Sequence, residues 1–308
     1  MPELPEVETI TRDLKPLIVG QKIDQIFVLK EKSFIGDARY LIDQKICGIS
    51  RCGKMIALEL TNKTFLAIHL KMTGQLIWVK GPNQQIPNSK IINKRLENCD
   101  LKIENSTLRV VSGYSDKAYQ KQTQLPHKYT RVWFLFASGD KLFFNDLRIF
   151  GWIKSLTLIE LEKEKDKIGF DALGPCSFPK FVRFISRYPN RLVKDFLQDQ
   201  KIIAGIGNIY ASEILFDANI LPTRKVKSLT KTEQTKLFQS INEILLKAIK
   251  LGGTSSSDYC RPDGSRGGYL DHAFVYAREG ERCKKCLAKI TRKKIGQRSA
   301  FFCPQCQK

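Results

Sequence analysis

Four cysteines near the C-terminus have the spacing of a metal site. They form two pairs, Cys283-x2-Cys286 and Cys303-x2-Cys306, with sixteen residues between the pairs. Two such knuckles can supply four thiolates to a tetrahedral zinc ion. Because cysteine fills all four positions, no coordination position is left for water or substrate. We therefore expect one structural Zn²⁺, on which the folding of the tail depends. An iron–sulfur cluster is the less favoured alternative for these ligands.

The segment between the two cysteine pairs is rich in positive charge. It contains Arg292, Lys293, Lys294 and Arg298. A metal-pinned hairpin that presents such side chains is suited to contacts with phosphate groups. Zinc ribbons also bind RNA and proteins, so this feature alone does not identify DNA as the partner.

The whole chain is strongly basic. Its 52 Lys and Arg residues exceed its 31 Asp and Glu residues by 21. This excess favours a polyanionic partner, with nucleic acid ahead of an anionic membrane surface, and a Lys-rich bias towards solubility as the plainest alternative. The sequence has no apolar run of about 18 residues, and it begins MPELPEVETI, without the basic region of a secretory signal. We expect a cytoplasmic protein, not membrane-bound, whose other cysteines are reduced.

The first half of the 308 residues is predicted to be rich in β-strands. A helix is expected first, at 5–17, with Pro5 in its first turn and Glu6 and Glu8 at the positive end of its dipole. Strands are then predicted from β-branched and aromatic segments at 22–29, 55–60, 65–70, 76–79, 132–136 and 141–144. The polar stretch from about 81 to 125 has weak periodicity, so we predict a long loop or an added subdomain there.

The second half is predicted to be mainly helical. A charge run at 160–167 indicates a link or a solvated helix. Helical patterns follow at 180–187, 192–200, 208–217 and 230–251. Residues 252–268 are rich in glycine and serine, a composition typical of a mobile loop. We expect an α+β protein of two domains, with a first domain at 1–155, a linker at 156–175, a helical domain at 176–270 and a metal-binding tail at 271–308.

Three motifs together resemble those of the bacterial formamidopyrimidine-DNA glycosylase family. They are PELPEVET at 2–9, GIGNIYASE at 205–213, and the four-cysteine tail that ends in CPQCQ. The resemblance covers most of the chain, but 81–125 looks like an insertion. It implies an N-terminal β-sandwich with flanking helices, a C-terminal helix–two-turns–helix domain and a zinc-finger β-hairpin. It also implies a bifunctional DNA glycosylase and AP lyase that excises 8-oxoguanine and formamidopyrimidines by β,δ-elimination.

In this family resemblance, Pro2 is the nucleophile. If Met1 is removed, the Pro2 nitrogen becomes a secondary amine, and an α-amine with a pKa of about 7.7–8 is partly neutral at pH 7. Attack on the sugar C1′ expels the base and leaves a cationic iminium, which acidifies C2′ and promotes β-elimination. Without the resemblance, a proline that begins a helix would be the simpler interpretation.

The resemblance assigns the proton transfers to three further residues. Glu3 is the acid/base beside the nucleophile. Lys54 lies on a hairpin, contacts the phosphate that flanks the lesion and donates a proton in β-elimination. Arg298 of the zinc finger contacts the DNA backbone and donates a proton in δ-elimination. Judged by residue type alone, Glu3 would be a helix-terminal charge and Lys54 a solvated surface lysine.

A base inside a duplex must be flipped out of the stack before it can react. Met72 in HLKMTG and Arg148 and Phe150 in DLRIFG match the family residues that fill the resulting gap. Methionine and phenylalanine can wedge between base pairs, and arginine can bond the orphaned base. The usual proline and second arginine of the latter motif are replaced here by Leu147 and Ile149. Met72 and Phe150 as ordinary core residues are the alternative.

Other matched positions are expected to bind the DNA backbone. His69 corresponds to a histidine near the lesion phosphate, although a structurally satisfied histidine is the alternative. Asn208 is predicted to cap a helix whose bare backbone amides bind phosphate. Lys194 lies upstream in the helical domain, where Asn190 and Arg191 replace the family's usual basic-Thr pair.

The long glycine- and serine-rich loop aligns with the segment that closes over a flipped 8-oxoguanine. We therefore expect damaged double-stranded DNA as the partner, oxidised purines as the lesions, and a monomer. The close alternative is an endonuclease VIII-like glycosylase for oxidised pyrimidines. A zinc-ribbon protein that binds nucleic acid without cutting it is the non-enzymatic alternative, which has no need of Pro2, Glu3 and Lys54.

Overall fold

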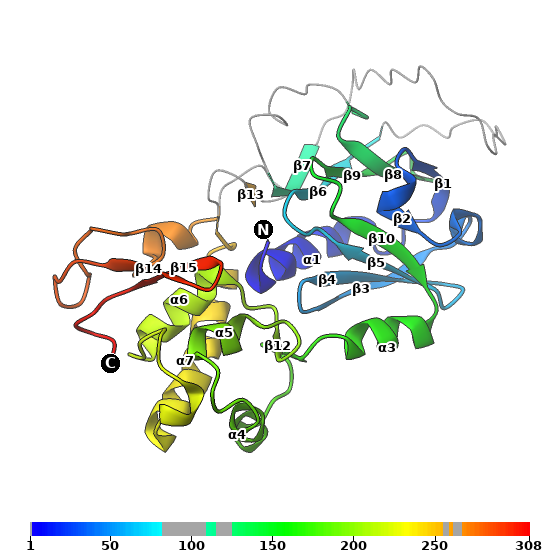
Figure 1. Cartoon of the computed structure of the whole chain (residues 1–308). Helices are drawn as coiled ribbons and strands as arrows, with labels where there is room; N and C mark the ends of the chain where they lie inside the picture. Colours follow the sequence, from blue (N-terminus) through cyan, green and yellow to red (C-terminus); the bar gives the residue numbers. More distant parts are fainter. Residues whose placement is uncertain (1, 82–108, 115–124, 255–258, 261–266) are drawn as a thin grey trace.

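The computed structural model of the chain describes residues 2–81, 109–114, 125–254, 259–260 and 267–308. Two β-sheets form the N-terminal half, helices dominate the C-terminal half, and a small hairpin module closes the chain (Figure 1). The predicted α+β class, with an N-terminal sandwich and a C-terminal zinc-binding hairpin, is confirmed. Among these described residues, no helix has the length and apolar character needed to cross a membrane.

Helix α1 (Leu4–Ile18) joins the two halves of the molecule. Val7, Ile10 and Leu14 recur at helical spacing and are buried in the sandwich core. Leu4, at the start of the helix, belongs instead to the core of the C-terminal half. Figure 1 shows the N-terminus at the junction of the two halves, so the first residues of the chain lie where two hydrophobic cores meet.

The sandwich consists of a six-stranded and a five-stranded sheet. The first has the order β1 (Ile23–Val28), β8 (Thr130–Phe136), β9 (Lys141–Asp146), β6 (Gly74–Val79), β7 (Arg109–Tyr114) and β13 (Tyr259–Cys260). The second has the order β2 (Phe34–Ile35), β10 (Trp152–Leu156), β5 (Phe65–His69), β4 (Met55–Leu60) and β3 (Ile46–Cys52). Two short 3-10 helices, Glu31–Ser33 and Ala38–Leu41, flank β2. Apolar side chains from both sheets and from α1 share one core.

Strand pairing brings the two predicted wedge motifs together. His69 at the end of β5 lies opposite Trp152 at the start of β10. Gly74 at the start of β6 lies opposite Asp146 at the end of β9. The loops between these strands, 70–73 and 147–151, therefore leave the sandwich at the same end.

The expected insertion contains a strand that its polar sequence did not reveal. Strand β7 pairs with β6 and, through Tyr114 and Gly113, with Tyr259 and Cys260 of β13. A β-strand thus crosses part of the stretch for which we predicted a loop or a subdomain. The remainder of the insertion (82–108 and 115–124), and the residues 255–258 and 261–266 of the expected base-capping loop, lie outside the described part of the chain.

The C-terminal half begins with α3 (Leu158–Asp166), so the charge run at 160–167 forms a helix. A parallel pair of short strands, β11 (Phe170–Asp171) and β12 (Ile203–Ala204), then ties the linker to the loop before α6. The helices are α4 (Phe178–Ser186), α5 (Val193–Gln198), α6 (Asn208–Asp217) and α7 (Lys231–Lys250), with short 3-10 helices at Val226–Ser228 and Tyr269–His272. The terminal hairpin pairs β14 (Thr291–Ile295) with β15 (Arg298–Phe302).

Candidate active site and DNA interface

The carboxylate of Glu3 lies against the start of helix α6. It accepts hydrogen bonds from the backbone N–H groups of Gly207 (2.7 Å), Ile209 (3.0 Å) and Tyr210 (3.4 Å). These are orphan donors of a helix N-terminus, and a carboxylate from the other end of the chain satisfies them. A Cβ at position 207 would lie 2.2 Å from the Glu3 Cδ, so only glycine allows this approach.

Two parts of our prediction for this loop are wrong. The N-cap of α6 is Gly207, not Asn208, which is the first residue of the helix. The amides of Gly207, Ile209 and Tyr210 are not bare, because Glu3 occupies them. The physical reason is long-range: the capping group comes from the other end of the chain, which a local helix-start pattern does not show.

Pro2 is buried directly before Glu3, at the edge of the same loop. The next residue, Leu4, donates its backbone N–H to the Gly205 carbonyl (3.0 Å). Gly205 has a φ of +112°, and a Cβ there would lie 2.5 Å from the Leu4 side chain. The glycines of the loop therefore hold the first residues of the chain in one place, and with them the nitrogen predicted to attack.

Lys54 reaches the same loop from the turn between β3 and β4. Its Nζ donates to the Ile206 carbonyl (3.2 Å), and the side chain is buried. Burial lowers the pKa of Lys54, and the positive charge of Arg298 adds to this, while Glu3 opposes it. Burial raises the pKa of Glu3, and Lys54 opposes that change. The structure thus places Lys54 and Glu3 on the carbonyl and the N–H of one peptide group, Ile206–Gly207, beside Pro2.

The turn that carries Lys54 is held by a partly buried network of charges. Arg51 donates to Glu8 (2.8 Å), to the Gly53 carbonyl (2.9 Å) and to Asp171 (2.5 and 3.1 Å). Asp171 also accepts the Gly53 backbone N–H (2.7 Å). These bonds join α1, the hairpin and the linker strand β11. Bidentate pairing of this kind fixes geometry as well as charge.

Glu6 is a residue of the site that our sequence reasoning missed. Its carboxylate is almost fully buried and accepts hydrogen bonds from the Glu3 N–H (2.8 Å), the Tyr210 hydroxyl (2.5 Å) and Thr254 (2.7 and 3.0 Å). We treated Glu6 only as a helix-terminal charge. The capping-box spacing between Glu3 and Glu6 was the signal that could have found the first of these bonds.

The three predicted wedge residues gather at one tip of the sandwich. Met72 and Phe150 are large apolar side chains that remain 43% and 51% exposed. The guanidinium of Arg148 lies 5.1 Å from the centre of the Phe150 ring, and its Nη1 lies 3.5 Å from the Met72 sulfur. Their exposure is contrary to the alternative interpretation of Met72 and Phe150 as core residues, because core residues would be buried.

His69 is close to this tip and is uncharged. Burial, together with the positive charges of Lys71 and Lys54, lowers the pKa of His69 to about 3. Its Nδ1 accepts the Lys71 backbone N–H (3.0 Å). Because a neutral imidazole that accepts at Nδ1 carries its proton on Nε2, the ring offers one fixed donor.

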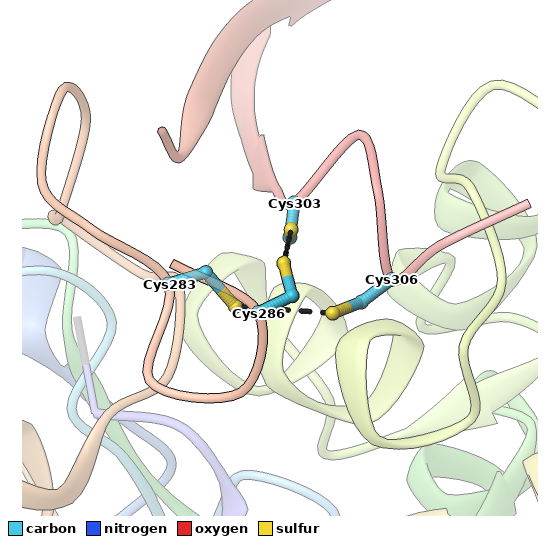
Figure 2. Close-up of side chains that lie close together, drawn as sticks. All are labelled: Cys283, Cys286, Cys303 and Cys306. Carbon is cyan, nitrogen blue, oxygen red and sulfur yellow. Dashed lines mark hydrogen bonds between the residues drawn. The ribbon is translucent and has the colours of Figure 1, made fainter. Parts of the chain in front are cut away.

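The four cysteines of the tail converge as expected (Figure 2). All four sulfurs lie within 4.8 Å of one another, with Cys283 and Cys306 3.9 Å apart and Cys286 and Cys303 3.4 Å apart. A tetrahedral zinc ion with Zn–S bonds of about 2.3 Å requires sulfurs about 3.8 Å apart, so this donor set fits the ion.

The zinc finger lies against α5 and α6, and three residues predicted to bind DNA, Lys194, Asn208 and Arg298, belong to these elements. Arg298 is exposed at the start of β15. Lys194 is fully buried, and its Nζ donates to the Ser299 carbonyl (3.2 Å); burial lowers the pKa of Lys194 to about 8.

A polar groove of about 570 Å³ separates α5 from the hairpin turn, and Arg191 and Arg298 lie on its opposite walls. Asn208 accepts a hydrogen bond from Gln198 (2.9 Å).

Glu213 connects α6 to the segment that enters the finger. Its buried carboxylate accepts the backbone N–H groups of Phe274, Val275 and Tyr276, each at 2.9 Å. Burial raises the pKa of the Tyr276 hydroxyl, and the Asn208 side chain opposes this change. The GIGNIYASE motif thus acts at both ends: its first residues receive Glu3 and Lys54, and its last residue positions the finger. Sequence reasoning did not single out Glu213 or Tyr276.

Comparisons with known proteins agree with this architecture. Three family models match: the formamidopyrimidine-DNA glycosylase N-terminal domain at residues 1–153, its H2TH domain at 169–260, and the zinc finger found in FPG and IleRS at 280–308. Formamidopyrimidine-DNA glycosylases from Pelotomaculum thermopropionicum and Prochlorococcus marinus (strain NATL2A) are 32% and 34% identical to the chain. Each comparison covers all of this chain and 99% or 100% of the relative.

Solved structures give the same result. The MutM (Fpg) protein of Thermus thermophilus is similar with a TM-score of 0.77 at 30% identity, covering 99% of this chain and 98% of that one. Wild-type Lactococcus lactis Fpg, in complex with DNA that contains N7-benzyl-Fapy-dG, has a TM-score of 0.79 at 30% identity over the whole of both chains. The fold and the site thus define a zinc-finger DNA glycosylase of base-excision repair.

The chain belongs to the formamidopyrimidine-DNA glycosylase family. It is a DNA-binding repair enzyme of the glycosylase and AP lyase type, and it carries one structural zinc ion in its finger.

Proposed function

We propose that this enzyme excises oxidised purines, 8-oxoguanine and formamidopyrimidines, from duplex DNA through a Schiff base on Pro2. The observation that carries the proposal is the convergence of Glu3 and Lys54 on the loop beside the buried Pro2. The complex of the Lactococcus lactis relative with DNA containing a formamidopyrimidine derivative supports the same lesion class. The proposal requires removal of Met1, since an amide nitrogen is not nucleophilic.

In this proposal the Pro2 amine attacks C1′ of the damaged nucleotide, and the C1′–N bond to the base breaks. Glu3 supplies a proton to the opening sugar ring; its raised pKa favours the protonated form that this step needs. The sugar is then held as an iminium, and loss of a C2′ proton expels the 3′ phosphate. A second elimination expels the 5′ phosphate, and water releases the sugar fragment from Pro2.

Pro2, Glu3, Lys54 and the loop at 205–207 together form the catalytic corner, and cationic groups around it bind the phosphates in this scheme. Lys54 supports the phosphate next to the lesion and the first elimination, and Arg298 supports the second. The positive charge of Arg298 already lowers the pKa values of two nearby amines, Lys54 and Lys194, and burial is the larger cause in both. The same field favours the neutral, nucleophilic form of the Pro2 amine.

The remaining predicted residues serve recognition. Met72, Arg148 and Phe150 enter the duplex and fill the space of the flipped nucleotide. His69 donates from Nε2 to the backbone near the lesion. Asn208 and the buried Lys194 hold the wall of the groove in which the DNA strand lies, beside Arg298. We further infer that the enzyme acts as a monomer on DNA in the cytoplasm.

Borohydride trapping tests the nucleophile, the processing of Met1 and the lesion class together. The protein is incubated with a duplex that contains one 8-oxoguanine opposite cytosine, and the reduced adduct is mapped by mass spectrometry. We expect one covalent adduct, on Pro2, in a chain that lacks Met1. An otherwise identical duplex with an oxidised pyrimidine is the matched substrate control.

Other results would overturn defined parts of the proposal. Trapping only on the oxidised pyrimidine duplex would show an endonuclease VIII-like specificity. Cleavage of an abasic duplex without excision of 8-oxoguanine would contradict the lesion class alone. Binding without any adduct on either duplex or on an abasic site, by protein verified to begin at Pro2, would contradict the nucleophile.

A further inference from the structure

We propose that Thr73 and Asp146 form a buried latch that sets the spacing of the two wedge loops, so that both are positioning residues for the extrusion of the damaged nucleotide. The latch consists of the Thr73 hydroxyl, the Asp146 carboxylate and the backbone N–H groups of Arg148 and Gly151. The inference rests on the proposed role of Met72, Arg148 and Phe150 in the duplex.

The Thr73 hydroxyl is the bridge between the loops. It donates a short hydrogen bond to Asp146 Oδ1, and it accepts the backbone N–H of Arg148 (3.0 Å). Thr73 follows Met72 directly, and it is 3% exposed. One hydroxyl group therefore connects the backbone beside the methionine wedge to the backbone of the arginine wedge.

The Asp146 carboxylate organises the second loop from inside. It is fully buried, and it accepts the Arg148 N–H at Oδ1 (3.2 Å) and the Gly151 N–H at Oδ2 (2.7 Å). The loop from 147 to 150 thus begins and ends on one side chain. A Cβ at position 151 would lie 2.8 Å from the Phe144 ring and 3.1 Å from Asp146 Oδ2, so glycine is needed where the loop closes.

Backbone strain shows what the latch has to restrain. Lys71 and Ile149 have φ values of +50° and +58°, in the left-handed region that side chains rarely adopt. A β-branched residue such as Ile149 is strongly disfavoured there. Each strained residue lies next to a wedge side chain, and such conformations persist only where surrounding contacts fix them.

The wedge side chains cannot supply this restraint themselves. Met72 and Phe150 are about half exposed, and Arg148 contacts both of them from the same exposed tip. Their positions relative to the duplex therefore depend on the backbone beneath them. A misplacement of about 1 Å in a preorganised group can cost on the order of 10²-fold in rate.

The latch acts on extrusion and not on the bond-breaking steps. Its hydrogen bonds described above join the two wedge loops to each other, and the corner chemistry needs no wedge once a sugar is already unstacked. Loss of the latch should slow excision of 8-oxoguanine from a duplex and spare strand cleavage at an abasic site in single-stranded DNA. General damage to the fold would lower both activities together.

Four variants of the full-length protein test this separation. Thr73→Val removes the bridging hydroxyl at nearly constant volume, and Thr73→Ser keeps it. Asp146→Asn places an amide donor where the carboxylate accepts. The matched control is Thr130→Val, in the six-stranded sheet that also contains Asp146. Thr130 is also 3% exposed, and its hydroxyl donates to Asn145 (2.8 Å), one residue from Asp146 and outside the wedge loops.

Single-turnover excision from an 8-oxoguanine duplex and cleavage of single-stranded abasic DNA are measured for each variant. We expect Thr73→Val and Asp146→Asn to slow duplex excision about 10-fold or more and to change single-stranded cleavage less than about 2-fold. Thr73→Ser should restore the duplex rate, and Thr130→Val should not separate the two activities. Equal losses on both substrates, or no loss on the duplex, would overturn the latch.

A spectroscopic measurement distinguishes failure of the latch from failure of the proposed function. The DNA is a duplex with a stable abasic analogue in one strand and 2-aminopurine opposite the analogue in the other. The fluorescence of 2-aminopurine rises when the wedge side chains unstack this base. We expect a smaller rise with Thr73→Val at saturating protein, and a normal rise with Thr73→Ser. This readout needs no excision, so it tests the latch even if the wild-type enzyme ignores 8-oxoguanine. An unchanged rise with Thr73→Val overturns the latch.

Discussion

The catalytic corner and the wedge tip differ in the burial of their functional side chains, although backbone hydrogen bonds fix both regions. In the corner, Glu3 and Lys54 are buried, and both are hydrogen-bonded to one loop of the other half of the protein. At the tip, Met72 and Phe150 remain exposed, and only the backbone beneath them is fixed. The corner holds ionisable groups away from water, whereas the tip holds apolar groups in water.

This difference separates two costs that the folded protein carries before DNA arrives. Burial raises the pKa of Glu3 and lowers the pKa of Lys54, so each charged form is disfavoured. Exposure of Met72 and Phe150 leaves apolar surface in contact with water. In both regions the costly groups become useful only against the substrate, so mutations in the two regions should separate stability from activity in different ways.

The largest expected effect is in the corner itself. Glu3→Gln should reduce single-turnover excision by about 10²–10⁴-fold, because the amide cannot donate or accept the proton that the sugar requires. DNA affinity should change far less, since Glu3 faces the α6 amides rather than solvent. Glu31→Gln, an exposed glutamate of the same half, is the control. Excision within 10-fold of the wild-type rate for Glu3→Gln would remove Glu3 from the chemistry.

The next effect concerns the support of the corner. Arg51→Met leaves the Glu8 and Asp171 carboxylates without their shared cation, and we expect a loss of about 3 kcal/mol in the free energy of unfolding. Arg12→Met is the matched control, because Arg12 also pairs with Glu8 but is 61% exposed. That change should cost under about 1 kcal/mol. Urea denaturation measures both, and equal losses would show that the network adds nothing beyond a surface pair.

A pH experiment examines the boundary between the two regions. Because the folded-state pKa of His69 is about 3, only the unfolded chain gains a proton on this residue as the pH falls below about 6.5. His69 therefore lowers stability as the pH decreases. Relative to His69→Gln, the wild type should lose at most about 2 kcal/mol in the free energy of unfolding between pH 6.5 and pH 5. Parallel pH profiles for the two proteins would show that His69 is not held neutral.

The smallest effect is expected at the tip. Phe150→Ala should change the free energy of unfolding by no more than about 0.5 kcal/mol, because the ring is half exposed. Duplex excision should nevertheless fall about 10-fold, since the ring is needed only inside the stack. Cleavage of single-stranded abasic DNA serves as the internal control. A large loss of stability would assign Phe150 to the core and erase the contrast with the corner.

Local patterns predicted the parts of this protein that depend on near neighbours. The helix at 208–217 has the predicted bounds, and α1 differs by one residue at each end, because apolar spacing and first-turn residues act within a few positions. The four cysteines were found by spacing alone, and their sulfurs converge. The resemblance added the residues of the corner and the tip, whose contacts no periodicity reveals.

Long-range contacts account for what was missed. Glu3 caps a helix that begins about two hundred residues later, so the N-cap was assigned to Asn208. Asp146 and Thr73 belong to motifs that we quoted, but only strand pairing shows that they meet. β7 lies in a polar stretch without alternation, and its partners β6 and β13 come from distant parts of the chain. These bonds depend on the tertiary fold and leave no local signature.

The Asp171 contact has a consequence for how the gene could be divided. Asp171 follows the solvated helix α3, yet it bonds Arg51 and the Gly53 amide beneath Lys54. A break within α3 would yield one fragment with Pro2, Glu3 and Lys54 and another with Asp171 and the loop that receives them. Neither fragment would hold the lysine turn, so lyase activity should return only when the two are mixed. The pair would then report its own association through strand cleavage.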